Sequence, residues 1–183
     1  MRLMLSGPKN FKQIREHYPE KIFLLEEWLS NQFDLLQMQY PDLEVGTTLY
    51  AGLDTLVTKL CIHKGIPYVA IAASNEQSLG WSEELQKDFL YFQARAKEVI
   101  FATPGKSLPG CVRLQFDTLS NWTLSVPERK LFLIKDGSYA VFQKKRKEAF
   151  QKEETTIYVM SRFKSKFKPK NDLKRVRSKN VKS

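Results

Sequence analysis

The chain has 183 residues, of which 42% are hydrophobic and 27% charged, and its formal charge is +10 at pH 7. This length suits one domain with an appendage, and the composition excludes a wholly disordered chain and a coiled coil. No stretch reaches the roughly 18 to 20 apolar residues that cross a bilayer, and the N-terminal apolar run is too short for a signal peptide. We therefore expect a soluble, cytoplasmic protein with no membrane span.

The predicted elements alternate between strands and helices. Buried or alternating apolar runs predict the strands, and apolar residues at helical spacing predict the helices. In chain order we expect a strand at 2–6, a helix at 19–39, a strand at 43–50, a helix with an apolar face at 53–61, a strand at 66–73, a helix at 82–96, a strand at 98–103, an irregular stretch at 104–128 with a short helix near 111–119, a strand at 130–135, a helix at 138–152 and a strand at 155–160. Asp54 and Ser82 are placed to cap helices, and Gly65 to end one.

Strands alternating with helices at this spacing imply right-handed parallel crossovers. The expected fold is therefore an α/β, three-layer Rossmann-like sandwich with a mostly parallel sheet, covering residues 1–160. Cys61 and Cys111 lie far apart without a C-x-x-C pair, and His17 and His63 are equally isolated. This spacing predicts neither a metal site nor a disulfide framework, and no feature calls for a cofactor.

The positive charge is concentrated in a C-terminal tail, residues 161–183. The tail has ten basic residues and one acid, a net charge of +9, which leaves +1 for the rest of the chain. Such a segment cannot bury enough apolar surface to offset its ordering entropy, so we expect it to be disordered when free. Polybasic segments attract DNA or RNA through counterion release, although a charged run can also be only solvated. The candidate nucleic-acid-binding residues are Arg162, Lys164, Lys166, Lys168, Lys170, Lys174, Arg175 and Arg177.

Four predicted turns carry a glycine where a strand ends. They contain Gly7, Gly52, Gly105 and Gly137. Ligands of open parallel sheets bind beyond the carboxyl ends of the strands, where glycine lets backbone amides approach a phosphate and helix N-termini favour anions. Glycine in one such turn can be needed for conformation alone, but four at one sheet edge predict a ligand pocket.

The order of these motifs resembles the SLOG superfamily of Rossmann-like domains, in particular its YpsA-like group, which is related to DprA and to the LOG enzymes. Ser6-Gly7-Pro8-Lys9 resembles the first-strand T-G-x-x-P turn, with its proline differently placed. Thr48 to Asp54 matches the G-x-x-G-x-D turn at Gly52 and Asp54. The G-I-P strand from Gly65, the pair Glu76-Gln77, Trp81 and the following helix are also similar, and Asn121 keeps its spacing to Asp136. The resemblance covers residues 1 to about 160 and excludes the tail.

The chain departs from the enzymes of this superfamily. LOG-type phosphoribohydrolases carry P-G-G-x-G-T-x-x-E, whereas the nearest counterparts here, Pro104-Gly105-Lys106 and Gly137-Ser138-Tyr139, lack the paired glycines and the glutamate. Cleavage of a glycosidic bond needs a carboxylate at the anomeric centre. Asp54, Glu76 and Asp136 are the carboxylates closest to the predicted site, but Asp54 is explained more simply as a helix cap.

The sequence therefore predicts recognition of a nucleotide-derived ligand or a nucleic acid at the carboxyl edge of the sheet, without turnover. The alternatives are a LOG-like nucleotide N-glycosidase and a ligand-free scaffold that docks on a larger protein or ribonucleoprotein complex. Related domains often pair, so a homodimer is a further hypothesis. The candidate ligand-binding residues are Ser6, Gly7, Lys9, Thr48, Gly52, Asp54, Glu76, Pro104, Gly105, Asn121, Asp136, Gly137 and Ser138.

Overall fold

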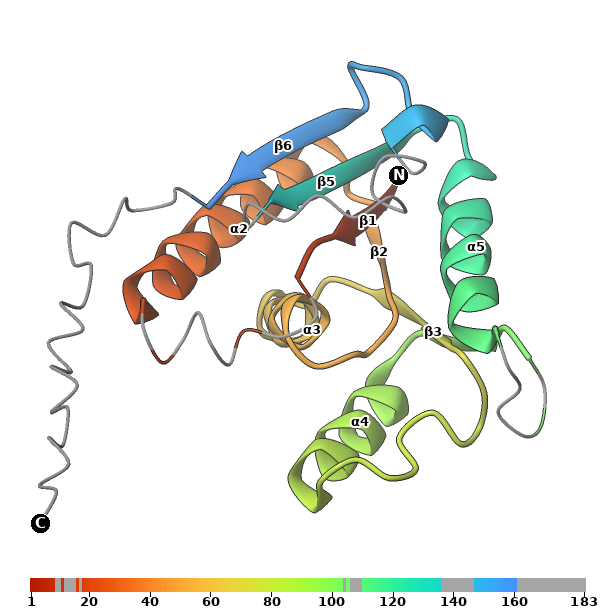
Figure 1. Ribbon diagram of the computed structural model, residues 1–183. Helices are drawn as coiled ribbons and strands as arrows, with labels where there is room; N and C mark the ends of the chain where they lie inside the picture. Colours follow the sequence, from red (N-terminus) through yellow and green to blue (C-terminus); the bar gives the residue numbers. More distant parts are fainter. Residues whose placement is uncertain are drawn as a thin grey trace, which may run out of the picture.

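The computed structural model describes residues 1–8, 11, 16, 18–103, 105, 110–135 and 147–160. Over these residues the chain forms a six-stranded sheet with the order β4-β3-β2-β1-β5-β6 (Figure 1). Every neighbouring pair of strands is parallel. The strands are β1 (Arg2–Ser6), β2 (Glu44–Thr47), β3 (Tyr68–Ala72), β4 (Glu98–Phe101), β5 (Arg129–Lys135) and β6 (Thr155–Val159). The all-parallel sheet confirms the expected α/β class.

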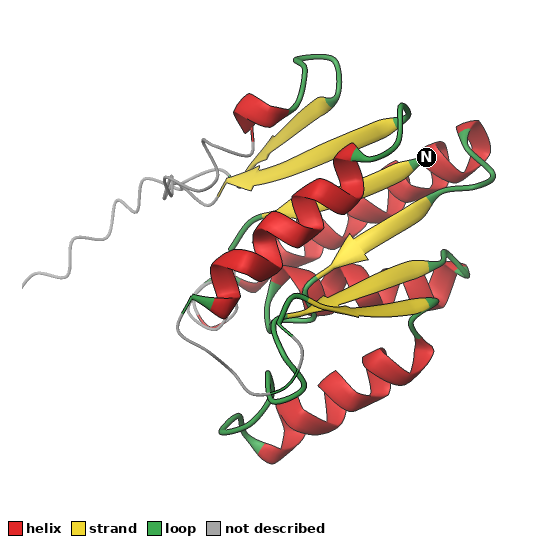
Figure 2. Cartoon of the chain, turned by 90° about the vertical axis from the view of Figure 1, so that its right-hand side faces the viewer, coloured by secondary structure: helices red, strands yellow, loops and turns green. Residues whose placement is uncertain are grey.

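Helices cover both faces of this sheet (Figure 2). The described helices longer than one turn are α2 (Pro19–Gln39), α3 (Leu53–Lys64), α4 (Glu83–Arg95) and α5 (Cys111–Leu124). Buried residues of α2, α3 and α4 share one core cluster, whereas those of α5 belong to a second cluster on the opposite face. The result is the three-layer sandwich that the alternation of elements predicts. None of the described helices is long and apolar enough to cross a membrane.

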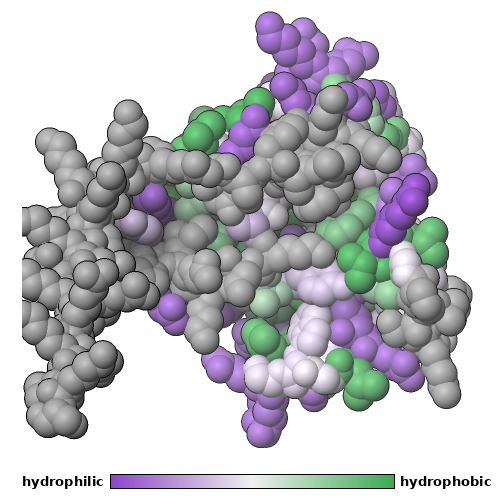
Figure 3. Space-filling view, in the orientation of Figure 1, coloured by the Kyte–Doolittle hydropathy of each residue, from purple (hydrophilic) through white to green (hydrophobic). Residues whose placement is uncertain are grey.

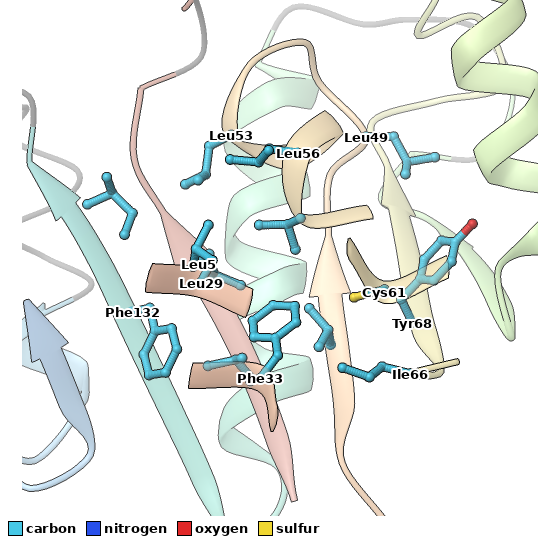
Figure 4. Packing of buried hydrophobic residues seen from close by; sticks show 14 of the residues in the cluster. Leu5, Leu29, Phe33, Leu49, Leu53, Leu56, Cys61, Ile66, Tyr68 and Phe132 are labelled. Carbon is cyan, nitrogen blue, oxygen red and sulfur yellow. The ribbon is translucent and has the colours of Figure 1, made fainter. Parts of the chain in front are cut away.

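The larger core lies between the sheet and α2, α3 and α4. Leu5 and Phe132 point from the sheet toward Leu29 and Phe33 of α2 (Figure 4). Both helix residues are fully buried, because apolar side chains recur along α2 at positions 22, 25, 29, 33 and 36 and form one face. Since burial of a large side chain contributes about 1.5 to 3 kcal/mol, this stripe anchors α2 along its length.

The second core lies on the other face of the same strands. Met4, Val69 and Leu131 point away from α2 and pack with Leu119 and Trp122 of α5. Three of the four inner strands, β1, β3 and β5, are therefore buried on both faces, as the uninterrupted apolar runs of β3 and β5 predict. On the outside, hydrophilic and hydrophobic residues are interspersed over the described surface that faces the viewer in Figure 3.

Several element boundaries agree with the sequence and several do not. Gly65 ends α3 in the left-handed conformation with φ 66°, and the Ser82 hydroxyl accepts the Leu85 amide at the start of α4, as predicted. The expected cap at Asp54 is wrong, because Gly52 is the N-cap of α3 and Asp54 lies inside the first turn. The short helix expected near 111–119 extends to Leu124.

The helix expected at 138–152 can be compared only in part. Residues 136–146 lie outside the described part of the chain, 147–149 are helical, and 150–154 are not. The predicted C-terminal end of this helix is therefore three residues too late. The chain then enters β6, which pairs with β5 from Leu131 opposite Thr155 to Lys135 opposite Val159.

Candidate ligand site at the carboxyl edge of the sheet

Strand order reverses between β1 and β5, since the chain runs outward from β1 through β2, β3 and β4 and then returns to β5 on the other side of β1. The carboxyl ends beside such a reversal are the place where ligands of open parallel sheets bind. Ser6 ends β1 opposite Leu133, and Thr47 ends β2 one strand away. The connection from β2 to α3 therefore lies next to the predicted binding edge.

The turn from β2 into α3 has an unusual backbone. Leu49 has φ 58°, and Gly52 has φ 98° with ψ −124°, a region that residues with a side chain rarely enter. The Leu53 amide donates to Pro8 O at 3.2 Å, which joins this turn to the turn after β1. The N-terminus of α3, with its partial positive charge, thus begins at the carboxyl edge.

Asp54 is held within the first turn of α3. The Thr48 hydroxyl donates to the Asp54 carboxylate, and the Thr58 hydroxyl donates to Asp54 O at 2.7 Å. Burial, followed by the nearby Cys111 and Asp54, raises the pKa of the Tyr50 phenol. Cys111 and Asp54 both lie close enough to the Tyr50 phenol to raise its pKa, so the three residues share one neighbourhood where α3 and α5 begin.

Three aromatic rings extend from this neighbourhood toward α4. The centroids of Tyr50 and Trp81 are 5.6 Å apart, and those of Trp81 and Phe89 are 5.7 Å apart in an edge-on arrangement. Phe89 is buried, whereas Tyr50 and Trp81 are half-buried. The faces of half-buried rings can stack on a planar group, which is how many proteins bind nucleobases.

A pair of buried glutamines lies behind the turn. The Gln77 amide nitrogen donates to Thr48 O at 2.8 Å, and its oxygen accepts the Ala73 amide at 2.6 Å. The Gln115 amide nitrogen lies 2.6 Å from Ile71 O, 2.8 Å from Gln77 Oε1 and 3.2 Å from Thr48 O. These contacts connect β2, β3 and α5 at their ends nearest the site.

Gln115 has one further feature. Its Oε1 atom is buried and finds no donor among the described residues. Rotating the amide by half a turn would place oxygen against three acceptors, so the orientation is fixed by its neighbours. An unsatisfied buried acceptor costs about 1 to 3 kcal/mol and often marks a functional site. Sequence reasoning missed Gln115 because a single glutamine in a helix carries no recognisable pattern.

The structure brings most of the described candidates to one edge. Thr48, Gly52 and Asp54 lie together, and Ser6 and Gly7 are joined to them through Pro8. Glu76 is in the loop after β3, where its amide donates to the Ser74 hydroxyl at 3.2 Å.

Glycine is needed at positions 7 and 105 for different reasons. Gly105 follows β4 with φ 91° and has open space around its α-carbon. Gly7 is enclosed instead, since a β-carbon there would lie 2.7 Å from Leu53 Cδ2 and 2.8 Å from Ile134 Cβ. The close packing of β1, β5 and α3 therefore explains Gly7 without a ligand.

Asn121 is not brought to this edge. It is exposed in the last turn of α5, which ends beside the start of β1. The Arg2 guanidinium, at the start of β1, donates to Trp122 O at 2.7 Å. This end of α5 therefore lies at the amino edge of the sheet. A residue there lies at the opposite edge from Asp54, because α5 runs antiparallel to the strands.

The remaining candidates lie outside the described residues. They are Lys9, Pro104, Asp136, Gly137 and Ser138 at the predicted edge, together with all eight basic residues of the tail. Among the residues that are described, no three His, Cys, Asp or Glu side chains are grouped as a metal site. His63 lies instead beside an open hollow of about 380 Å³ between α3 and α4, lined also by Lys59, Asp88 and Tyr91.

Compared with known proteins, the chain matches no family model and no curated protein. The resemblance to SLOG domains therefore stays a prediction from short motifs.

Proposed function

We propose that the carboxyl edge of the sheet binds a nucleotide-derived ligand or a nucleic-acid segment without turnover, and that the basic tail contacts nucleic acid. The observation that carries this proposal is the placement of Asp54 in the first turn of α3, directly after the glycine-dependent turn at Gly52. In this proposal the α3 N-terminus accepts a phosphate, and Asp54, oriented by Thr48, accepts a hydrogen bond from a ribose hydroxyl or a base.

The surrounding residues support this assignment. Tyr50 and Trp81 offer aromatic surface next to Asp54, and the Gln77 and Gln115 amides fix the backbone behind it. Every one of these groups binds or orients, and none forms a nucleophile and base pair. The proposal therefore assigns recognition to this edge and assigns no bond cleavage.

The proposal is tested by titrating the full chain with nucleoside monophosphates, dinucleotides and nucleotide sugars in a calorimeter. We expect binding of at least one of them, and we expect Asp54→Asn to weaken it by roughly tenfold or more, since a hydrogen bond to a charged group is worth about 1.5 to 3 kcal/mol. Asp117→Asn is the matched control, because Asp117 is exposed on α5 and pairs only loosely with Arg113 at 3.8 Å.

Three results would overturn the proposal. Equal affinity in the Asp54→Asn variant and the parent would remove Asp54 from the site. Release of free base from a nucleoside monophosphate, detected by chromatography, would show N-glycosidase activity in place of recognition without turnover. A chain that binds none of the ligands would favour the scaffold alternative.

A further inference from the structure

The outer face of α2 carries a stripe of exposed residues that no described part of the chain covers. Its members follow one another at intervals of three and four residues, which places them on one side of the helix. The stripe consists of Glu20, Leu24, Glu27, Asn31, Leu35 and Met38, all exposed. Leu24, Leu35 and Met38 are 51%, 59% and 83% exposed, so half of the stripe is apolar surface left in water.

The stripe is also acidic where α2 begins. Glu20 and Glu27 form no ion pair with any described residue. Asp34, farther along α2, is already paired with Lys64 at 2.5 Å. The first half of α2 therefore presents one carboxylate on each side of Leu24. This combination suits a partner that is both basic and apolar.

The basic tail begins next to this half of α2. Tyr158 in β6 lies 4.7 Å from Trp28 between ring centroids, and Met160, the last described residue, is buried in the same core cluster as Ile22 and Leu25. Because β6 runs parallel to β1 and α2 follows β1, the end of β6 and the start of α2 lie at the same edge of the sheet (Figure 1).

The tail is complementary to the stripe, because it is both basic and partly apolar. It carries a net charge of +9 together with the apolar residues Phe163, Phe167, Leu173 and Val176. At about 3.3 Å per extended residue, Phe163 is within roughly 10 Å of Met160 and Phe167 within roughly 25 Å. The distance along α2 from Glu20 to Leu35 is about 22 Å, so these residues can reach the stripe as far as Leu35.

We propose that the tail, residues 161–183, docks on the outer face of α2 in the same molecule, with lysines and arginines against Glu20 and Glu27 and phenylalanines against Leu24 and Leu35. A polyanion that binds the tail removes the cations from these carboxylates and so releases the tail from α2. Nucleic acid therefore competes with the outer face of α2 for binding to the tail. The docking does not depend on the nucleotide site, because it involves none of its residues, whereas the release by a polyanion rests on the proposed contact between the tail and nucleic acid.

The test uses the full chain with a nitroxide label on Ser178→Cys, since Cys61 and Cys111 are both buried. We expect the label to broaden the amide NMR signals of α2 near Leu24 and Leu35 several-fold more than those of Leu90, which is 59% exposed on α4. Raising salt from about 50 mM to about 500 mM should remove the difference, because the Debye length falls to a few ångströms. A single-stranded oligothymidine should remove it at low salt.

The matched variants carry Glu20→Gln with Glu27→Gln, and Glu83→Gln with Glu84→Gln. Both pairs remove two exposed acids from a single helix, so they change the net charge equally. Only the α2 pair should abolish the selective broadening. Broadening that is uniform, unaffected by salt or equal in the two variants would overturn the proposal. Broadening of an isotopically labelled chain by a spin-labelled second chain would also overturn it, in favour of pairing between copies.

Discussion

Tyr68 is a residue at which burial and titration are linked in this fold. It is 2% exposed at the start of β3, and its hydroxyl donates to Phe92 O at 2.5 Å, which ties the sheet to α4. Burial, with a smaller contribution from Cys61, raises the pKa of Tyr68 from 10.0 to about 12. The folded state therefore disfavours the phenolate, whereas the unfolded chain ionises near pH 10.

This shift predicts an alkaline loss of stability. A raised folded pKa contributes stability that is complete below pH 10 and is lost as the pH rises toward 12. Tyr68→Phe should lower the free energy of unfolding at neutral pH by about 1 to 2 kcal/mol, because Phe92 O loses its donor. It should also flatten the decline above pH 10. Urea unfolding over a pH series measures both effects, with the exposed Tyr91→Phe as control, and an unchanged alkaline decline would contradict the assignment.

Single residues differ in how well the sequence predicts them. Ser82 and Gly65 are predictable, because a serine before a helical apolar stripe and a glycine after one act through local backbone chemistry. Asp54 and Gln115 are not, since their partners Thr48, Gln77 and Ile71 come from other strands and loops. The preference of aspartate for N-cap positions predicts Asp54 as the cap. In the structure Gly52, with its positive φ, is the N-cap, and the helix begins at Leu53.

At the scale of elements, the contact between β2 and α5 depends on Gly46. A β-carbon there would lie 2.5 Å from Leu119 Cδ1 and 2.7 Å from Trp122 Cζ3. Gly46→Ala should therefore push α5 away from the sheet and lower the free energy of unfolding by about 1 to 3 kcal/mol. Gly80→Ala is a control for backbone effects alone, since Gly80 has φ 85° and open space around it.

A double variant separates crowding from other causes. Leu119→Ala removes the side chain that the new methyl group would strike, at its own cost in burial. If crowding is the cause, Gly46→Ala should cost less in the Leu119→Ala background than in the parent. Strictly additive free energies of unfolding in chemical denaturation would show that Gly46 is required for another reason.

The strands β3 and β5 are predicted better than the helix α5, because burial on both faces leaves a direct record in the sequence. The apolar runs at β3 and β5 locate both strands to within about two residues, since each is covered on both faces. The C-terminal end of α5 is predicted five residues too early, because its buried face includes Gln115 and Thr123 among the apolar residues. A helix whose buried side is partly polar weakens the periodic pattern from which it would be recognised.

At the scale of the whole molecule, the charge is divided between two parts with different chemistry. The tail carries +9 of the total +10, so residues 1–160 are close to neutral. If the tail contacts nucleic acid through phosphates, the affinity for a single strand should fall steeply as salt is raised. For six to ten phosphate contacts the loss between about 50 mM and 200 mM salt is roughly a thousandfold or more.

Replacing the eight candidate basic residues of the tail by glutamine tests this division directly. The variant should lose nearly all of its salt-dependent affinity for a labelled oligonucleotide, measured by fluorescence anisotropy. Without the basic side chains, the phosphates of the oligonucleotide release few counterions on binding. Its affinity for a mononucleotide should not change, since the proposed site at Asp54 lies in the α/β domain. A control with glutamine at Lys144, Lys145, Arg146 and Lys147 removes the other basic run of the chain. If that control loses strand binding while the tail variant keeps it, the polyanion binds the folded domain, and the tail has no direct role in nucleic-acid recognition.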